Sequence, residues 1–481
     1  MPEPLIRFGT DGWRALAAEE FTLPNVRAVA QATADYFRAH PVPGRARRLV
    51  VGYDTRPLGD RFAEATAEVF AGNRFEVLLT DRPTPTPAVS FSIRAARLLG
   101  GVVITASHNP FTYNGFKVKP HYAGPAEPEM TRWIERRLFK GPVRRVPLEE
   151  GIAGRKIARL DLTPSYLRFL RSYVEWPLLR RARFKVAYDS MHGAGQDLLQ
   201  KALAGGRPTI LPARPPGGGI PSSHRPEPVG EQLRELAALV RKGRCHAGLA
   251  TDGDADRVGL IGPDGRFVSS QETMSLLLWH LLEDRRWRGM VVTTVAGTNA
   301  IDRIVAEYGV PLKRTPVGFK HIARLMRSSE VLFGGEESGG YGFKGFVPER
   351  DGLLAGLLIL EMMAMRRQGL GEILERMRRR FGRWSYARAD LRLERPLDPQ
   401  RLLRWARRAS SRKALPGSGL GFSRIQTVDG AKILFEDGSW LLLRPSGTEP
   451  LLRIYAEAGN GPALRRLLKT GQAVGRRLVN G

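Results

Sequence analysis

The sequence contains a single cysteine, Cys245, among 481 residues. An internal disulfide needs two cysteines, so none can form within this chain. A structural zinc site that depends on several thiolate ligands is excluded for the same reason. A reducing compartment is the simplest setting for such a chain, and we therefore expect a cytoplasmic protein.

Long hydrophobic runs are also missing. No apolar segment approaches the roughly 18–20 residues that a membrane-spanning helix needs. The first residues, Met1-Pro2-Glu3-Pro4, lack the basic and then apolar pattern of a signal peptide. We therefore expect a soluble protein with no membrane partner. Neither a Walker-type loop nor a dinucleotide fingerprint occurs, so the function must depend on other loops.

Acidic residues are few relative to basic ones. The chain has 76 Lys and Arg against 48 Asp and Glu, a formal net charge of +28. Such a charge is compatible with a nucleic-acid partner. However, the arginines are spread along the chain, and clusters such as 378–380 adjoin apolar residues in helix-like segments. No zinc-finger spacing or aromatic RNA-binding signature accompanies them. We expect no dedicated nucleic-acid partner, although the field would attract an anionic substrate.

Length and patterning predict several domains of the α/β class. A chain of this length typically forms about three or four domains. Short apolar runs alternate with amphipathic segments, as in βα units. We expect strands at 49–54, 76–79, 101–104, 184–189, 258–261, 290–295, 431–435 and 440–443. We expect helices at 23–37, 60–71, 165–173, 272–282, 300–308 and 352–365, and a basic amphipathic helix at the C-terminus.

Breaks in this pattern suggest four units. Proline and polar residues interrupt it at 141–154, which we interpret as a linker. We expect an α/β domain at 1–150, a second at 151–250, a third at 251–375 and an α+β domain at 376–481.

The most informative segment is Thr105-Ala106-Ser107-His108-Asn109-Pro110, called here the serine loop. It follows Gly101-Val102-Val103-Ile104, an apolar run typical of a buried strand. Open α/β sheets keep their chemistry at strand ends. The loop therefore brings a hydroxyl, an imidazole and a carboxamide to one exposed place, although a simple polar turn would have a similar composition.

Three aspartates alternate in Asp252-Gly253-Asp254-Ala255-Asp256-Arg257, the acidic loop. Hard oxygen ligands in this number suit Mg²⁺ or Ca²⁺. An EF-hand would need glycine where Arg257 stands, so that interpretation fails. Magnesium with an incomplete protein shell indicates that a phosphate supplies a further ligand.

Two more loops are suited to bind a ligand. The glutamate loop, residues 334–340, carries Glu336 and Ser338 among glycines, and these groups can bond sugar hydroxyls. The arginine loop, residues 444–450, combines Arg444 with hydroxyls and backbone N–H groups around a glycine, which is typical of a phosphate cradle. Taken singly, each could be an ordinary turn.

Together the four loops closely resemble the signature loops of the α-D-phosphohexomutase family, the phosphoglucomutases and phosphomannomutases. The resemblance covers nearly the whole chain, with the loops in family order and spacing. It implies an α/β fold in which three related α/β domains with mixed sheets and a C-terminal α+β domain surround a central cleft. It also implies an isomerase that moves a phosphoryl group between C1 and C6 of a phosphosugar substrate, through a phosphoserine and a hexose 1,6-bisphosphate.

The resemblance also implies roles for individual residues. Ser107 would be the phosphoserine. Mg²⁺ would be held by Ser107, Asp252, Asp254 and Asp256. The transfer site would be lined by Arg14, His108, Lys117 and Arg257. The substrate would be bound by Val317, Gly318, Lys320, Glu336, Ser338, Arg350, Arg444, Ser446, Gly447, Thr448 and Arg453.

Two departures from the family pattern concern the base and the substrate. Some members end the glutamate loop with histidine, whereas Gly340 stands here, as in glucose-specific members that carry the same Glu-Glu-Ser. In those, a downstream basic residue approaches the substrate, and Arg350 matches it. Arginine is a poor proton acceptor because its pKa exceeds about 12. We therefore assign Arg350 to phosphate or hydroxyl binding and leave the base open between His108 and Lys117.

The Glu-Glu-Ser sequence argues against the amino-sugar members, whose loops differ. We expect a glucose phosphate substrate, with dual glucose and mannose activity as the alternative. A catalytically silent protein that binds polyanions is a further hypothesis, and the intact ligand set argues against it. We expect a monomer or a homodimer.

Overall fold

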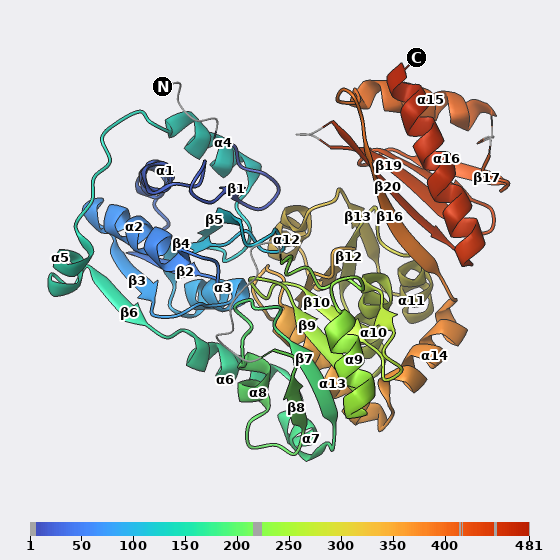
Figure 1. Cartoon of the computed structure of the whole chain (residues 1–481), viewed down its shortest axis with the longest axis horizontal. Coiled ribbons are helices and arrows are strands. Elements are labelled where there is room, and N and C mark those ends of the chain that lie inside the picture. The colour runs from blue at the N-terminus through green and yellow to red at the C-terminus, as the bar shows by residue number, and fades with distance from the viewer. Residues whose placement is uncertain (1–5, 215–223, 413–414, 416, 447–449, 481) are drawn as a thin grey trace.

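The computed structural model describes residues 6–214, 224–412, 415, 417–446 and 450–480. Its strands form four separate sheets, each with its own helices (Figure 1). The predicted architecture of three α/β units with mixed sheets and a C-terminal α+β unit is confirmed. Within the described ranges, no helix combines the length and the apolar character needed to cross a membrane.

The first sheet has the order β1-β5-β4-β2-β3-β6 and is mixed, because β5 runs antiparallel to both β4 and β1. Its strands are β1 Trp13–Leu16, β2 Ala46–Tyr53, β3 Glu76–Thr80, β4 Leu98–Ile104, β5 Tyr113–Pro120 and β6 Ile157–Leu160. Its helices are α1 Leu23–Ala39, α2 Gly59–Gly72, α3 Thr86–Ala95, α4 Pro128–Arg137 and α5 Leu148–Ala153. Every residue of β4 is buried, which explains the apolar run that precedes the serine loop.

The first unit extends beyond the boundary expected at residue 150. β6 pairs in parallel with the edge of β3, from Val77 opposite Ile157 to Thr80 opposite Leu160. The segment 141–154, predicted as a linker, contains α5, which packs against α2. The chain therefore leaves the first sheet only after residue 160.

The second sheet has the order β11-β10-β9-β7-β8. Its strands are β7 Lys185–Asp189, β8 Thr209–Pro212, β9 Ala247–Thr251, β10 Val258–Ile261 and β11 Phe267–Val268. Its helices are α6 Thr163–Tyr173, α7 Trp176–Arg181, α8 Leu198–Leu203 and α9 Arg234–Gly243. β10 pairs antiparallel with β9, so strand 258–261 belongs to this unit rather than to the third, and the sheet continues past the expected boundary at 250.

The third sheet has the order β13-β12-β14-β15. Its strands are β12 Met290–Thr294, β13 Leu312–Thr315, β14 Val331–Gly335 and β15 Tyr341–Phe343. Its helices are α10 Ser270–Glu283, α11 Ala300–Tyr308, α12 Phe319–Ser328, α13 Gly352–Arg366 and α14 Leu370–Phe381. Ser269 and Glu272 form a capping box that starts α10, and the Asp351 side chain caps α13.

The fourth sheet is antiparallel throughout, in the order β16-β20-β19-β18-β17. Its strands are β16 Ser385–Arg392, β17 Phe422–Gln426, β18 Ala431–Phe435, β19 Trp440–Pro445 and β20 Leu451–Ala458. Two helices, α15 Pro399–Arg412 and α16 Gly461–Asn480, accompany it. The predicted C-terminal helix is confirmed, with Leu464, Leu467 and Val474 in the core of this unit.

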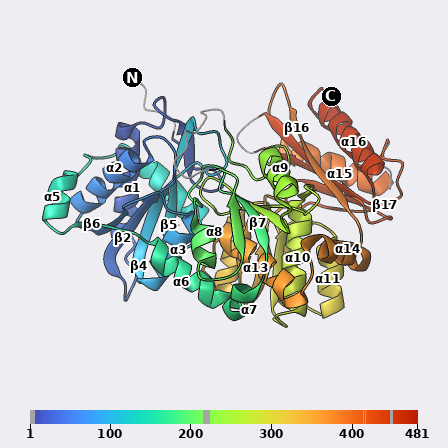
Figure 2. The same ribbon diagram turned by 60° about the horizontal axis from the view of Figure 1, so that its bottom comes forward.

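The first three units share one hydrophobic cluster, and the first and the fourth each have a further large cluster of their own. One hydrophobic cluster includes Val89 of α3, Leu249 of β9 and Leu358 of α13. The fourth unit touches the third through a small apolar cluster that includes Val295 and Trp440. Figure 2 shows the first and fourth units at opposite ends, with the second and third between them.

Candidate functional site

The serine loop lies between β4 and β5, and its serine is buried. Ser107 is 1% exposed, and its backbone has a positive φ of 54°. Its hydroxyl donates a hydrogen bond to Asp252 Oδ2 at 2.8 Å. His108 lies beside it, with its Nδ1 3.4 Å from the Ser107 Oγ. The serine of the first unit therefore meets a carboxylate of the second.

The acidic loop connects β9 with β10, and its three aspartates converge. Asp252, Asp254 and Asp256 are fully buried, and one carboxylate oxygen of each lies within 4.8 Å of the others. A Cβ at Gly253 would come 2.4 Å from the Ser107 carbonyl oxygen. This glycine therefore allows the acidic loop to pack directly against the serine loop.

The acidic loop has the donors that a hard divalent cation requires. Asp254 Oδ1 and Asp256 Oδ1 are buried and have no hydrogen-bond partner among the described residues. Burial raises the pKa of Asp252 well above its usual value, and the charges of Asp256 and Asp254 add to this effect. Several converging carboxylates suit Mg²⁺ or Ca²⁺. These residues and the Ser107 oxygen fit the magnesium ligands predicted from the sequence.

Lys117 on β5 faces the acidic loop. β5 runs antiparallel to β4, with Lys117 opposite Val103. Its Nζ lies 2.7 Å from Asp254 Oδ2, 3.2 Å from Asp256 Oδ2 and 3.0 Å from Asp11 Oδ2. Burial alone would lower the pKa of Lys117, but the three carboxylates raise it above its usual range. A buried ammonium group is therefore fixed beside the carboxylates.

Two arginines flank the serine loop. Arg14 on β1 donates a hydrogen bond to Asn109 Oδ1 at 2.9 Å. The Arg257 Nε lies 3.9 Å from Asp252 Oδ2 and is buried without a hydrogen-bond partner within the described part of the chain. Burial and then the charges of Arg257 and Arg14 lower the pKa of His108 well below its usual value. Burial and the positive charges of both arginines therefore favour the uncharged form of the His108 imidazole.

The glutamate loop follows β14 and reaches the acidic loop. Gly340 forms an isolated antiparallel bridge with Arg257. Glu336 is buried, and burial raises its pKa to about 7 although Arg350 acts in the opposite direction. The Ser338 Oγ is buried and has no hydrogen-bond partner among the residues described. A carboxyl group and a hydroxyl are therefore available for the hydroxyl groups of a ligand.

Arg350 lies among carboxylates from three loops. Its guanidinium donates to Asp11 Oδ2 and Asp256 Oδ2, both at 2.6 Å, and to Glu336 Oε2 at 3.3 Å. A Cβ added at Gly340 would come 2.3 Å from the Arg350 Cδ. Position 340 therefore has no room for a histidine while Arg350 takes this path, so packing accounts for the glycine.

Arg444 on β19 shares a carboxylate with Val317, another of the residues predicted to bind the substrate. Asp429 Oδ2 accepts a hydrogen bond from Arg444 Nε at 2.7 Å. The same oxygen accepts one from the backbone N–H of Val317 at 2.9 Å. Asp429 therefore connects the third unit to the fourth at the position of two predicted substrate residues.

Two other predicted residues of the fourth unit, Ser446 and Arg453, lie near Arg444. Arg453 on β20 is opposite Arg444, and its Nε is buried with no hydrogen-bond partner in the described ranges. The Ser446 N–H donates to the Leu451 carbonyl at 2.7 Å. Two further predicted residues lie outside the described residues: Gly447 and Thr448.

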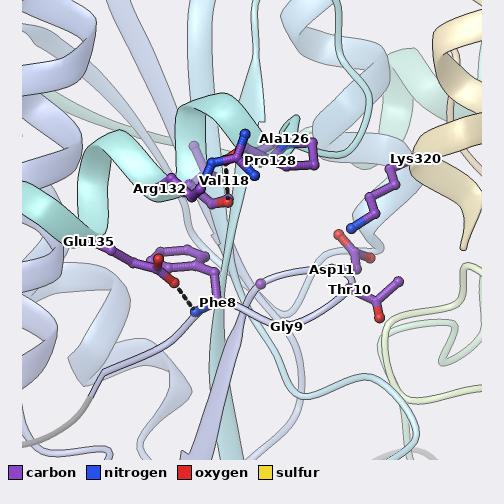
Figure 3. Close-up of a pocket in the computed structure, with 12 residues that line it drawn as sticks. Phe8, Gly9, Thr10, Asp11, Val118, Ala126, Pro128, Arg132, Glu135 and Lys320 are labelled. Carbon is purple, nitrogen blue, oxygen red and sulfur yellow. Dashed lines mark hydrogen bonds between the residues drawn. The ribbon is translucent and has the colours of Figure 1, made fainter. Parts of the chain in front are cut away.

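Lys320 contributes to a pocket beside the N-terminal segment (Figure 3). The pocket has a volume of about 150 Å³ and is lined by residues 8–12 and by part of α4. Figure 3 shows Asp11 and Lys320 near each other at one end. Burial and then the charge of Arg444 lower the pKa of Lys320. Gly318, with a φ of 125°, precedes α12 and lies against Thr10.

Two carboxylates of the site were not among the residues predicted from the sequence. Asp11 pairs with Lys117 and Arg350. Its one local signal in the sequence is its place in a short turn between Gly9 and Gly12. Asp429 precedes Gly430, a pair typical of a turn. Nothing in that pair indicates an arginine partner 15 residues later.

The chain matches models of all four domains of phosphoglucomutase/phosphomannomutase. The alpha/beta/alpha domains I, II and III match residues 5–144, 164–265 and 269–381. The C-terminal domain matches residues 397–470.

Individual proteins resemble the chain over nearly its whole length. A phosphoglucomutase/phosphomannomutase of Thermococcus kodakarensis is 31% identical, covering 96% of this chain and 97% of its own. A probable phosphoglucosamine mutase of Thermococcus gammatolerans is 32% identical, covering 97% of each chain. The crystal structure of a putative phosphomannomutase from Thermus thermophilus superposes with a TM-score of 0.82 at 33% identity, covering 98% of each chain. The chain therefore belongs to the phosphoglucomutase/phosphomannomutase family, the α-D-phosphohexomutases, which are isomerases.

Proposed function

We propose that this family member is a phosphoglucomutase that interconverts glucose 1-phosphate and glucose 6-phosphate through a phosphorylated Ser107. One observation carries the proposal. The Ser107 hydroxyl is hydrogen-bonded to Asp252, one of three buried aspartates that fit a magnesium site. A serine oxygen in this position can carry a phosphoryl group next to the cation that neutralises it.

The proposed reaction consists of two opposite transfers. In the first, the bond between phosphorus and the Ser107 oxygen breaks, and a bond forms between phosphorus and a free hydroxyl oxygen of the sugar phosphate. The hydroxyl gives up its proton, and glucose 1,6-bisphosphate results. In the second transfer, the other phosphoryl group returns to Ser107, and the sugar oxygen that it leaves takes up a proton. Protons and phosphoryl groups balance over the cycle.

The neighbouring charged groups support these transfers. Lys117, Arg14 and Arg257 surround the serine with fixed positive charge, which stabilises the transferring phosphoryl group without reorganisation. Mg²⁺, held by Asp252, Asp254, Asp256 and the Ser107 oxygen, would neutralise further charge on the phosphoryl oxygens. This chain's contribution is mainly to position the reactants and to balance their charge.

Binding of the rest of the substrate is assigned to the other units. Glu336 and Ser338 would bind sugar hydroxyls, and Arg350 would orient Glu336 while contacting phosphate or hydroxyl oxygens. The phosphate that is not being transferred would be held by Val317, Gly318, Lys320, Arg444, Ser446, Gly447, Thr448 and Arg453. Since the two transfers involve opposite ends of the sugar, the bisphosphate has to turn over between them.

The choice of glucose rests on the glutamate loop. The Glu337 side chain accepts a hydrogen bond from Thr294 at 2.6 Å, so Glu336 and Ser338 are the groups left for the sugar. We expect kcat/KM to be highest for glucose 1-phosphate when glucose, mannose and glucosamine 1-phosphates are compared under identical conditions. A higher value for either other sugar would contradict this choice.

An amino-sugar substrate is the second candidate, because relatives named phosphoglucosamine mutase are as similar to this chain as those named phosphoglucomutase. A protein with dual glucose and mannose activity is the third. The same comparison of three substrates separates them, since each predicts a different order of kcat/KM.

Asp429 provides a test of the link between the third and fourth units. We expect Asp429→Asn to raise the KM for glucose 1-phosphate roughly tenfold, because a hydrogen bond between charged groups contributes about 1.5–3 kcal/mol. Turnover at saturation should change less. Asp437→Asn is the matched control, since Asp437 is an exposed residue of the same unit that accepts hydrogen bonds from Ser439 in the turn before β19, at the other end of that strand from Arg444. An unchanged KM in Asp429→Asn would show that Asp429 does not orient Arg444.

A further inference from the structure

We propose that Arg56 is the positioning residue that holds the serine loop in the conformation needed for phosphoryl transfer. This inference rests on the proposed function, because it concerns how Ser107 is presented. Arg56 follows β2, in the turn before α2, and is 3% exposed. A charged side chain is almost never so deeply buried unless its groups are paired.

Every N–H group of the Arg56 guanidinium has an acceptor. A guanidinium carries five N–H donors. The Nε donates to Asp54 Oδ2 at 3.1 Å. The other four donors are used by backbone carbonyls at 2.6–2.9 Å, and these belong to Ser107, Asn109, Pro110 and Tyr113. Three of these carbonyls lie in the serine loop, and the fourth, that of Tyr113, lies at the first residue of β5.

Arg56 and Asp54, which are hydrogen-bonded to each other, fix the backbone carbonyl and the backbone N–H of Ser107. The Ser107 carbonyl accepts from Arg56 at 2.6 Å. The Ser107 N–H donates to Thr105 Oγ1 at 2.9 Å, and that hydroxyl donates to Asp54 Oδ2 at 2.5 Å. Ser107 is therefore held from both sides in its left-handed conformation, which a residue with a Cβ seldom adopts without support.

Arg56 acts without touching the reacting atoms. Among the described residues its hydrogen bonds go to Asp54 and to carbonyl oxygens, and none reaches the Ser107 Oγ or the aspartates of the acidic loop. The Phe111 ring lies 5.0 Å from its guanidinium carbon and covers another side. Arg56 thus determines where the serine oxygen lies, whereas the acidic loop and Lys117 provide the charge.

Lysine cannot replace this arginine, because an ammonium has three donors and no planar fork. We expect Arg56→Lys to lower kcat by about 10²-fold, since a small misplacement of reacting groups can cost that much. The KM for glucose 1-phosphate should change little, because the residues proposed to bind the sugar and its distal phosphate are untouched. Arg61→Lys is the matched control, because Arg61 lies on α2 with 69% of its side chain exposed. The turnover of this variant should equal that of the wild type.

Chemical rescue distinguishes positioning from general stability. Arg56→Ala leaves five acceptors around an empty space, and guanidinium ion at concentrations far below those that unfold the protein should restore part of kcat. Ethylammonium ion should not restore kcat. Amide hydrogen exchange in residues 105–112 should increase in Arg56→Lys while β4 and β5 stay protected, and this readout does not depend on mutase activity.

The outcomes separate this inference from the proposed function. Wild-type turnover tests the proposed function, whereas the ratio of variant to wild-type kcat and the amide exchange in residues 105–112 test the role of Arg56. Wild-type kcat and exchange in Arg56→Lys would overturn the inference. A folded Arg56→Ala that guanidinium does not restore would also overturn it. Should Arg56→Ala fail to fold, Arg56→Lys decides by the same two measurements.

Discussion

Replacing Ser107 by alanine is expected to lower mutase turnover by roughly 10³-fold or more, the scale seen when a covalent nucleophile is removed. The variant has no oxygen to accept a phosphoryl group, so both proposed transfers stop. Intact-mass measurement should at the same time show no phosphorylated species, whereas the wild-type protein should gain one phosphoryl group on exposure to glucose 1,6-bisphosphate. The fold should be retained, because the Ser107 side chain donates a single hydrogen bond, to Asp252.

A serine outside the site serves as the control for this variant. Ser172 lies on α6, is exposed and bonds to the Phe169 carbonyl within its own helix. Ser172→Ala should keep wild-type turnover and wild-type phosphorylation. Phosphorylation that persists in Ser107→Ala would mean that another residue carries the group, and the assignment of Ser107 would be wrong.

The second large effect is expected at the acidic loop. Asp254→Asn keeps the size of the side chain but removes one of three charges that fit a cation, so more Mg²⁺ should be needed to reach half-maximal activity. At saturating Mg²⁺ we expect kcat to stay lower by roughly 10²-fold, comparable to the loss of one preorganised electrostatic contact. A chelator should abolish wild-type turnover, and added Mg²⁺ should restore it.

Thermal unfolding provides a readout of the metal site that is independent of activity. A ligand that binds the folded state raises the melting temperature by mass action. Mg²⁺ should therefore stabilise the wild-type protein at lower concentrations than it stabilises Asp254→Asn. Asp60→Asn, at the exposed start of α2, should respond like the wild type. Equal responses of wild type and Asp254→Asn, or full turnover in chelator, would contradict the proposed metal site.

Much of the fold could be predicted because hydrophobic periodicity is a local signal. The helix at 300–308 and the strand at 431–435 have the predicted bounds. Two strands were harder to place. β6 has four residues, and one of them is buried, so its position depends on pairing with β3. The strand at 258–261 was recognised, but its sheet depends on antiparallel pairing with β9, which the pattern does not specify.

The site was predictable where its chemistry lies in contiguous loops. The serine and acidic loops could be identified from spacing, and the structure places Ser107 against Asp252. Partners that are distant in sequence could not be identified in this way. Arg350 bonds to Asp11 across 339 positions. Arg56 gave no signal, because a buried arginine bonded mainly to carbonyls does not differ in sequence from an arginine in an exposed turn.

The central claim is that Ser107 passes a phosphoryl group to a hexose phosphate, and a single-turnover experiment tests it most directly. The wild-type protein is first phosphorylated with glucose 1,6-bisphosphate, and the remaining bisphosphate is then removed. The phosphoprotein is mixed with Mg²⁺ and an equimolar amount of glucose 1-phosphate. The protein mass and the sugar phosphates are followed together. We predict that the protein loses one phosphoryl group from the peptide containing Ser107 as glucose 1,6-bisphosphate appears. A phosphoprotein of unchanged mass, with no bisphosphate formed, would contradict the account.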